Sequence, residues 1–232
     1  MRLILASTSP RRREIVSLLG VPFDVAAPRY EEIHDPRVPP ERQAMHFALE
    51  KARSIQSPDA VVIGSDTVVV LDDVVSSVTL DRCLASSVTL DRCLALGKPV
   101  DLDDARRMLT MLRGRTHRVV TAVAVLAPGR ADQVWCETAS VTMRAADDGE
   151  IDAYLRTGES MDKAGAYALQ GEGGRLIETI DGDRFVVIGL PLRSVADALR
   201  RCAIEIPVDV DRLYARREAT IQHHARPEST AR

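Results

Sequence analysis

The sequence is poor in aromatic residues, which make up 3% of its 232 residues. The core must therefore be built from Val, Leu, Ile and Ala, and the hydrophobic content of 45% is enough for one large domain or two small lobes. Long apolar runs are also lacking, so no segment is expected to span a membrane as a helix. The first residues lead directly into a predicted strand and lack the pattern of a signal peptide.

Cysteine is scarce as well, and a surplus of positive charge is lacking. The four cysteines, at positions 83, 93, 136 and 202, form no C-x-x-C pair. This usage predicts a cytoplasmic protein in a reducing environment, without disulfides or a structural zinc. The net charge of −3 argues against general nucleic-acid binding, which favours a basic surplus.

The stretch from Leu3 to Gly20 carries the first strong signal. Its apolar start, residues 3–6, predicts a strand. Ser9 and Pro10 then predict a helix start, because Ser caps free N–H groups and Pro suits the first helical position. Gly20 is a typical helix end.

The first turn of that helix carries Arg11 and Arg12, with Arg13 just behind, although acidic side chains would suit the positive helix end better. Serine hydroxyls, free N–H groups and guanidinium groups together predict a phosphate-binding site. The alternative is a basic surface turn.

Two charged residues fall on apolar segments. Lys51 lies on the apolar face of a helix predicted over 41–56, and Asp66 lies in the middle of the strand predicted over 60–71. A buried, unpaired carboxylate is costly, so a metal ion, a lysine or a catalytic water is expected beside Asp66. The alternatives are a lysine that extends to solvent, and an aspartate bonded to backbone N–H groups at a bulge near Gly64.

The decapeptide SSVTLDRCLA occurs at 76–85 and again, without a change, at 86–95. Structural repeats diverge, so this identity indicates a recent tandem duplication. Its unit is too short for a solenoid repeat. We interpret 76–95 as a loop insertion at the tip of a hairpin, followed by the segment Leu-Gly-Lys-Pro, which contains Lys98.

The remaining chain alternates between helices and strands. The patterns predict a helix from Asp101 or Asp103 to Gly114, antiparallel strands over 116–126 and 133–143, a helix over 147–156, a hairpin of 175–180 with 184–188, and a helix from Pro191 to about Cys202. Beyond Pro207 no core stripe is visible, and residues 229–232 are expected to be disordered.

Several motifs occur in a fixed order along the chain: Ser-x-Ser-Pro-Arg-Arg, Leu-Glu-Lys-Ala-Arg, Gly-Ser-Asp-Thr, Gly-Lys-Pro, Gly-Arg-Thr-His, Asp-Lys-Ala-Gly-Ala-Tyr and Gly-Leu-Pro. In this the chain resembles the Maf family of nucleoside triphosphate pyrophosphatases, once called septum formation proteins. The resemblance covers residues 2 to about 203, apart from 76–95. It implies one catalytic domain over 1–203 and a partly disordered extension over 204–232.

The resemblance implies an α/β fold of the Maf and inosine-triphosphatase type, in which a long mixed twisted sheet flanked by helices forms two lobes with a central cleft. It implies hydrolysis of a nucleoside triphosphate to the monophosphate and pyrophosphate, with a divalent cation, Mg²⁺ or Mn²⁺. It further implies a homodimer, house-cleaning of modified nucleotides and a link to cell-division arrest. The net charge and the lack of long apolar runs predict no nucleic-acid and no membrane partner.

The same resemblance assigns roles to individual residues. Asp66 would act as the general base or as a metal-site carboxylate, with Glu32 as its acidic partner. The triphosphate would be held by Ser9, Arg11, Arg12, Lys51 and Lys98.

The family has branches that differ in their nucleobase. The positions that distinguish the branch acting on dTTP and UTP match Arg11, Thr67 and Gln170. A Gln amide can pair with both a carbonyl and the imide N–H of uracil or thymine. The alternatives are a pyrophosphatase of 7-methyl-GTP or other modified purine nucleotides, and a nucleotide-binding regulator of septum formation.

Overall fold

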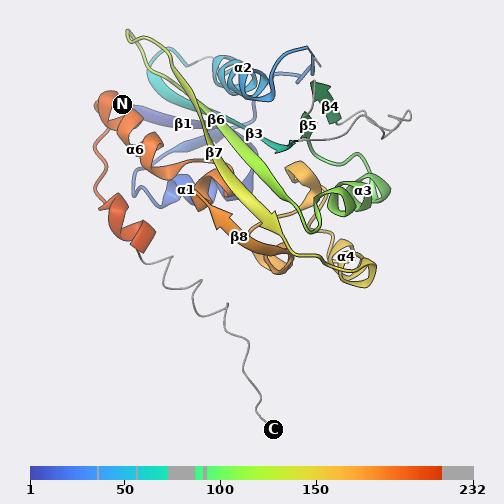
Figure 1. The fold of residues 1–232 in the computed structure, drawn as a ribbon. Coiled ribbons are helices and arrows are strands. Elements are labelled where there is room, and N and C mark those ends of the chain that lie inside the picture. Colours follow the sequence, from blue (N-terminus) through green and yellow to red (C-terminus); the bar gives the residue numbers. More distant parts are fainter. Residues whose placement is uncertain (36, 56, 73–86, 91–92, 216–232) are drawn as a thin grey trace.

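A computed structural model describes residues 1–35, 37–55, 57–72, 87–90 and 93–215. In this part of the chain, eight strands form one mixed sheet with the order β2-β1-β3-β6-β7-β8, while β5 pairs with β3 and β4 with β5 (Figure 1). The strands are β1 Arg2–Ala6, β2 Asp24–Ala26, β3 Ala60–Leu71, β4 Ser87–Leu90, β5 Cys93–Leu96, β6 Thr116–Leu126, β7 Gln133–Met143 and β8 Ile177–Asp181. Only β1 pairs in parallel, with β2 and β3, among these strands.

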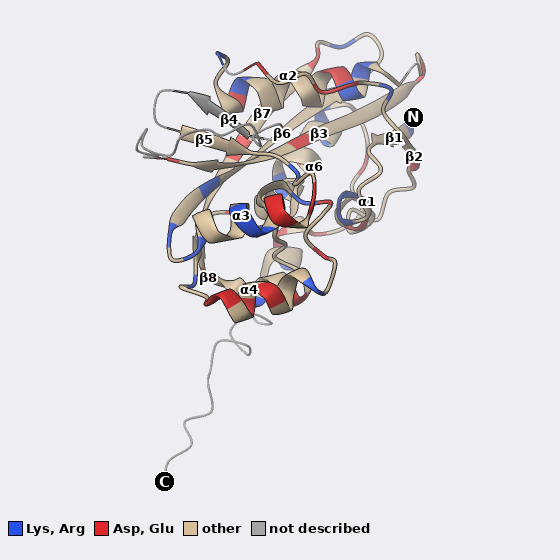
Figure 2. Cartoon of the chain, turned by 90° about the vertical axis from the view of Figure 1, so that its right-hand side faces the viewer, with Lys and Arg blue, Asp and Glu red and all other residues tan. Residues whose placement is uncertain are grey.

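Helices flank this sheet, as expected for the α/β class. They are α1 Pro10–Ser17, α2 Pro40–Arg53, α3 Leu102–Leu112, α4 Asp148–Leu155, α5 Arg184–Ile188 and α6 Leu192–Arg201, with two 3-10 helices, η1 Ala164–Ala166 and η2 Gly171–Leu176. Figure 2 shows α2 at one end of the molecule and α3 and α4 at the other. The predicted α/β class with a mixed, helix-flanked sheet is confirmed.

Alternation along the central strands explains why both faces of the sheet are covered. On β1, Leu3 and Leu5 pack with α1 and α6, whereas Ile4 and Ala6 pack with α2. The strands β3 and β6 alternate in the same way. A third apolar cluster joins α3 and α4 to the far halves of β3, β6 and β7.

Local signals for helix ends agree with the structure. Ser9, Asp101 and Asp147 are N-caps whose side chains accept backbone N–H groups, and Asp147 with Glu150 forms a full capping box. The predicted pairing of 116–126 with 133–143 is confirmed as β6 with β7.

The predicted hairpin of 175–180 with 184–188 is wrong. The strand β8 pairs with β7 instead, and residues 184–188 form the helix α5. Asp183 caps that helix by accepting the Phe185 N–H, and Gly189 ends it at a φ of 119°. These two end signals override the strand preference of the β-branched residues between them.

The predicted loop insertion over 76–95 is wrong for the described residues of the second decapeptide copy, which are strand. Residues 87–90 form β4, and its last three residues, Cys93 to Ala95, belong to β5. Leu94 and Leu96 are buried, and β5 pairs with β3 from Leu71 to Val69. The second copy thus supplies β4 and most of β5, which lies between β3 and β4, whereas the first copy, 76–85, lies outside the described residues.

Deleting residues 76–85 is expected to raise the free energy of unfolding by about 1 kcal/mol, because it shortens the connection between β3 and β4 about threefold and keeps the whole second copy. Urea unfolding of the two chains measures this difference. A deletion variant less stable than the parent chain would show that the first copy contributes contacts of its own.

The chain beyond Pro207 was expected to lack a core stripe, and for residues 208–214 that prediction is wrong. Ile204 and Val210 are buried in the cluster that contains α1 and α6. Tyr214 donates from Oη to Asp183 Oδ2 at 2.7 Å and lies under the Arg193 guanidinium. Residues 216–232, with the expected disorder at 229–232, lie outside the described chain.

Two expectations from composition concern the compartment. Cys136 and Cys202 are free thiols, and Cys83 lies outside the described residues. Among the helices of the described chain, none combines the length and the hydropathy needed to cross a membrane.

His117 on β6 is buried, and its Nε2 lies 2.7 Å from the Tyr167 hydroxyl. Burial disfavours the charged imidazole and lowers the pKa of His117 from 6.5 to about 4. The unfolded chain therefore binds more protons between these two values, so stability falls as the pH drops from 6.5 to 4, by about 3 kcal/mol. Urea unfolding from pH 7 to pH 4.5 should show this fall in the wild type and a flatter profile in His117→Phe; equal profiles would contradict it.

Candidate active site

A cleft of about 540 Å³ opens beside the middle of β3. It is lined by the first turn of α1, the loop of residues 28–34, α2, residues 97–98 and the segment of residues 162–170. The structure brings all nine predicted site residues to this cleft: Ser9, Arg11, Arg12, Glu32, Lys51, Asp66, Thr67, Lys98 and Gln170. Their individual roles stay predictions.

Gly64 explains how α2 comes close enough to deliver Lys51. A Cβ at Gly64 would lie 2.1 Å from the Ala48 carbonyl oxygen, so only glycine allows this contact between β3 and α2. Pairing of β3 with β6 continues without a shift through Ser65 and Asp66. Gly64 therefore serves close packing, and the alternative of a bulge at this position is not observed.

Lys51 joins two carboxylates at the floor of the cleft. Its Nζ lies 2.7 Å from Asp66 Oδ1 and 2.6 Å from Glu32 Oε1. The side chains of Lys51 and Asp66 are 10% and 13% exposed. The lysine thus does not extend to solvent, and Asp66 has the cationic partner that its burial requires.

The N-terminus of α1 faces the same cleft. Ser9 caps the helix by accepting the Arg12 N–H, and Pro10 occupies the first turn as predicted. The buried Ser7 hydroxyl accepts the Ser9 N–H at 3.2 Å. Backbone N–H groups at a helix N-terminus favour an anion, and the arginines that follow add full positive charges.

The Arg12 guanidinium makes two hydrogen bonds that the sequence did not predict. Its Nε donates to the Gly189 carbonyl at 2.9 Å, and its Nη2 donates to the Thr67 hydroxyl at 3.0 Å. Thr67 in turn lies 3.0 Å from the Thr121 hydroxyl, which donates to the Val186 carbonyl. Burial lowers the pKa of Arg12, while the nearby carboxylates oppose that shift.

Lys98 differs from the other cations of the cleft because it is exposed and has no ion-pair partner among the described residues. It follows directly after β5, the strand supplied by the second decapeptide copy. The duplication therefore leaves Lys98 in the cleft, free to meet a ligand.

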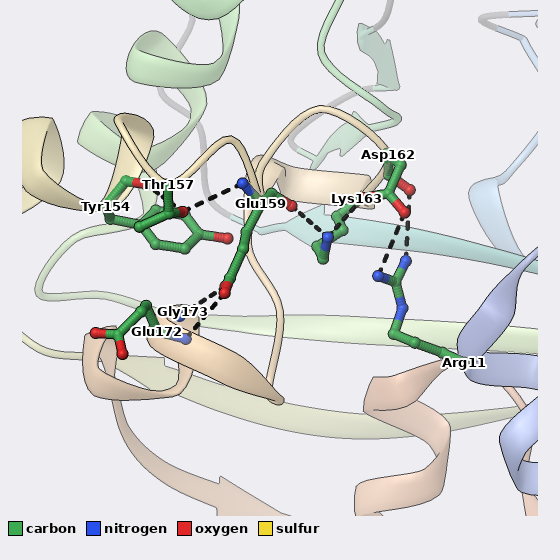
Figure 3. A network of polar contacts seen from close by, with 8 residues as sticks. All are labelled: Arg11, Tyr154, Thr157, Glu159, Asp162, Lys163, Glu172 and Gly173. Atoms are coloured by element: carbon green, nitrogen blue, oxygen red, sulfur yellow. Dashed lines mark hydrogen bonds and ion pairs between the residues drawn. The ribbon is translucent and has the colours of Figure 1, made fainter.

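The segment from Glu159 to Tyr167 contains cleft residues to which no role was assigned from the sequence (Figure 3). Arg11 pairs with Asp162 at 3.4 Å, and Lys163 pairs with Asp162 on its other side at 2.5 Å. Nearby cations lower the pKa of Asp162 against the effect of its burial. The motif Asp-Lys-Ala-Gly-Ala-Tyr was the available signal, but only the fold shows that it faces α1.

Glu32 and Asp66 are the residues that fit a divalent cation. Mg²⁺ is held in many enzymes by one or two carboxylates together with substrate phosphates. Two neighbouring carboxylates are therefore enough protein ligands for such an ion. Clusters of three or more His, Cys, Asp or Glu with metal-site geometry are absent from the described residues. The donor set therefore suits a cation that binds together with its substrate.

The fold and the cleft define an α/β protein in which the arginine-rich N-terminus of a helix lies in the same cleft as a lysine–carboxylate centre. The chain belongs to the Maf family: residues 2–202 match the family described as Maf-like protein.

Curated relatives cover nearly the same length. A dTTP/UTP pyrophosphatase of Bacillus velezensis is 40% identical over 206 residues, which cover 88% of this chain and 98% of that protein. A dTTP/UTP pyrophosphatase of Anaeromyxobacter dehalogenans is 41% identical, with coverages of 89% and 96%. A solved nucleoside-triphosphatase, a dITP/XTP pyrophosphatase from Mycobacterium abscessus, is 15% identical with a TM-score of 0.39, covering 86% of this chain and 94% of its own.

Proposed function

We propose that this protein is a nucleoside triphosphate pyrophosphatase that hydrolyses dTTP and UTP to the nucleoside monophosphate and pyrophosphate. The observation that carries the proposal is the placement of Lys51, between Glu32 and Asp66, in the same cleft as the N-terminus of α1. The names of the curated relatives support the same reaction and the same two substrates.

In the proposed reaction, a water oxygen bonds to a phosphorus atom of the α–β anhydride and the bond to the bridging oxygen breaks. Asp66 accepts the proton that this water loses, and Lys51 holds the Asp66 carboxylate in place. Arg12, Lys98 and the α1 N-terminus neutralise the charge of the triphosphate and of the departing pyrophosphate.

Glu32 and Asp66 would hold the divalent cation, Mg²⁺ or Mn²⁺. When bound, such a cation clamps phosphate oxygens and makes a water molecule more acidic. In the absence of the cation, Lys51 keeps the two carboxylates together, because its ammonium group offsets their mutual repulsion.

Base selection is assigned to Gln170 and to the Arg11 and Thr67 positions. Gln170 lines the cleft, and its amide can meet a carbonyl and an imide N–H at once. The Thr67 hydroxyl already contacts Arg12 and Thr121, so its influence on the base acts through the position of Arg12. The alternative substrates are 7-methyl-GTP and other modified purine nucleotides.

The test is pyrophosphate release by the purified protein from dTTP, UTP, CTP, 7-methyl-GTP, ITP and ATP, with Mg²⁺ or Mn²⁺. Turnover of dTTP and UTP well above the others supports the proposal. Preference for 7-methyl-GTP or ITP would move the chain to a purine branch, and binding without turnover would favour a nucleotide-binding regulator of septum formation.

Three further predictions accompany this function: a cytoplasmic location, a homodimer, and a link between nucleotide house-cleaning and cell-division arrest. The location rests on cysteine usage, and the other two rest on the family resemblance.

A further inference from the structure

Glu159 lies between α4 and η1, and its carboxylate contacts the backbone of the turn that follows Gln170 (Figure 3). Its carboxylate accepts the backbone N–H groups of Glu172 at 3.3 Å and Gly173 at 3.4 Å. These N–H groups lie at the start of η2, where the helix itself offers no acceptor. Gln170 is the residue that precedes this helix. A carboxylate is well suited to this place, because both of its oxygens can only accept.

The shape of the turn fits the same carboxylate. Gly171 has a φ of +78°, and a Cβ at this position would lie 2.6 Å from Glu159 Oε1. Gln170 itself has an extended backbone, with a φ of −89° and a ψ of 151°. The backbone of residues 171–173 is therefore packed directly against Glu159, which restrains the backbone that follows Gln170.

The backbone of Glu159 is also linked, through Lys163 and Asp162, to Arg11, another position assigned to base selection. Lys163 donates from Nζ both to the Glu159 carbonyl and to Asp162 Oδ1. Asp162 Oδ2 then pairs with Arg11 across the cleft (Figure 3). One segment thus contacts the turn after Gln170 through a carboxylate and Arg11 through Lys163 and Asp162.

We propose that Glu159 is a positioning residue for nucleobase selection, which rests on the function proposed above. If the Gln amide rotates by 180°, its carbonyl and its NH₂ group exchange places. The rotated amide can then pair with cytosine as readily as the original one pairs with uracil. Selection of uracil and thymine over cytosine therefore requires a fixed amide. The contacts of Glu159 with residues 171–173 supply a fixed backbone beneath that amide.

The experiment compares Glu159→Gln with Glu178→Gln, a control with the same charge change at an exposed residue on β8. In Glu159→Gln, the ratio of kcat/KM for UTP to kcat/KM for CTP should fall about tenfold, the usual scale for losing charge-assisted hydrogen bonds. The fall should come from a higher KM for UTP and dTTP, with kcat changed less than about twofold. The control should keep the wild-type ratio.

An unchanged ratio in Glu159→Gln, or an equal loss on all nucleotides, would overturn the proposal and leave Glu159 a purely structural role. Calorimetric binding of the α,β-imido analogues of dUTP and dCTP gives the same ratio without turnover. Failure of wild-type turnover would therefore count against the proposed function, whereas an unchanged binding ratio would count against the role of Glu159 alone.

Discussion

Asp66→Asn is expected to lower kcat about a thousandfold for every nucleotide that the wild type hydrolyses. The amide cannot accept the proton of the attacking water, and general-base catalysis contributes about 10² to 10⁴ in rate. It also removes one of the two carboxylates that would hold the cation. KM should change much less, because the substitution leaves intact the phosphate contacts that we propose for Arg12, Lys98 and the helix N-terminus.

Asp72→Asn provides the matched control for this variant. Asp72 follows β3 directly and pairs with Arg118 outside the cleft, and Arg118 keeps its contact with Glu41 when Asp72 is neutral. Its kcat should stay within about twofold of the wild type. Asp66→Asn that retained a tenth of wild-type kcat would contradict the role of Asp66 as the base.

Lys51→Met is expected to damage both stability and turnover. It leaves Glu32 and Asp66 without their shared cation, and removing one partner of a buried ion pair costs about 3 kcal/mol or more. Turnover should fall by about two orders of magnitude or more, because the carboxylates then repel each other and lose their geometry. Urea unfolding and steady-state kinetics on one protein preparation measure both effects.

The double variant with Lys51→Met and Asp66→Asn separates these two effects. It removes the uncompensated carboxylate, so it should regain much of the lost stability while its activity stays absent. A single Lys51→Met variant with wild-type stability would mean that the three groups are not coupled, against the distances in the structure.

Local and periodic signals in the sequence predicted much of this fold. The caps at Ser9, Asp101 and Asp147 depend on side chains next to the backbone groups that they satisfy, so sequence proximity is enough to identify them. The near-continuous apolar runs of β3 and β6 likewise indicate strands that are buried on both faces. The motif order then indicated nine residues that the fold brings to one cleft.

Other features depend on contacts between distant parts of the chain. The helix α5 carries a strand-like sequence, and its Phe185 and Ile188 are buried in the cluster that contains α1 and α6. Val210 is buried because α1 and α6, which are distant in the sequence, pack against it. The bond from Arg12 to the Gly189 carbonyl and the pair of Arg11 with Asp162 join residues more than a hundred positions apart.

Gly64 illustrates the same limit at a single position. Its sequence neighbours allowed either a bulge or a close contact, and both would favour glycine. Only the distance of 2.1 Å that would separate a Cβ at this position from the Ala48 carbonyl oxygen distinguishes them. That close approach of α2 is what places Lys51 against Asp66.

The most direct measurement is the identity of the products formed from dTTP by the purified protein with Mg²⁺, separated by ion-exchange chromatography. Hydrolysis at the α–β anhydride predicts dTMP and pyrophosphate in equal amounts, and neither product with Asp66→Asn. Release of dTDP and inorganic phosphate would contradict the proposed reaction, and so would products that form equally well with Asp66→Asn.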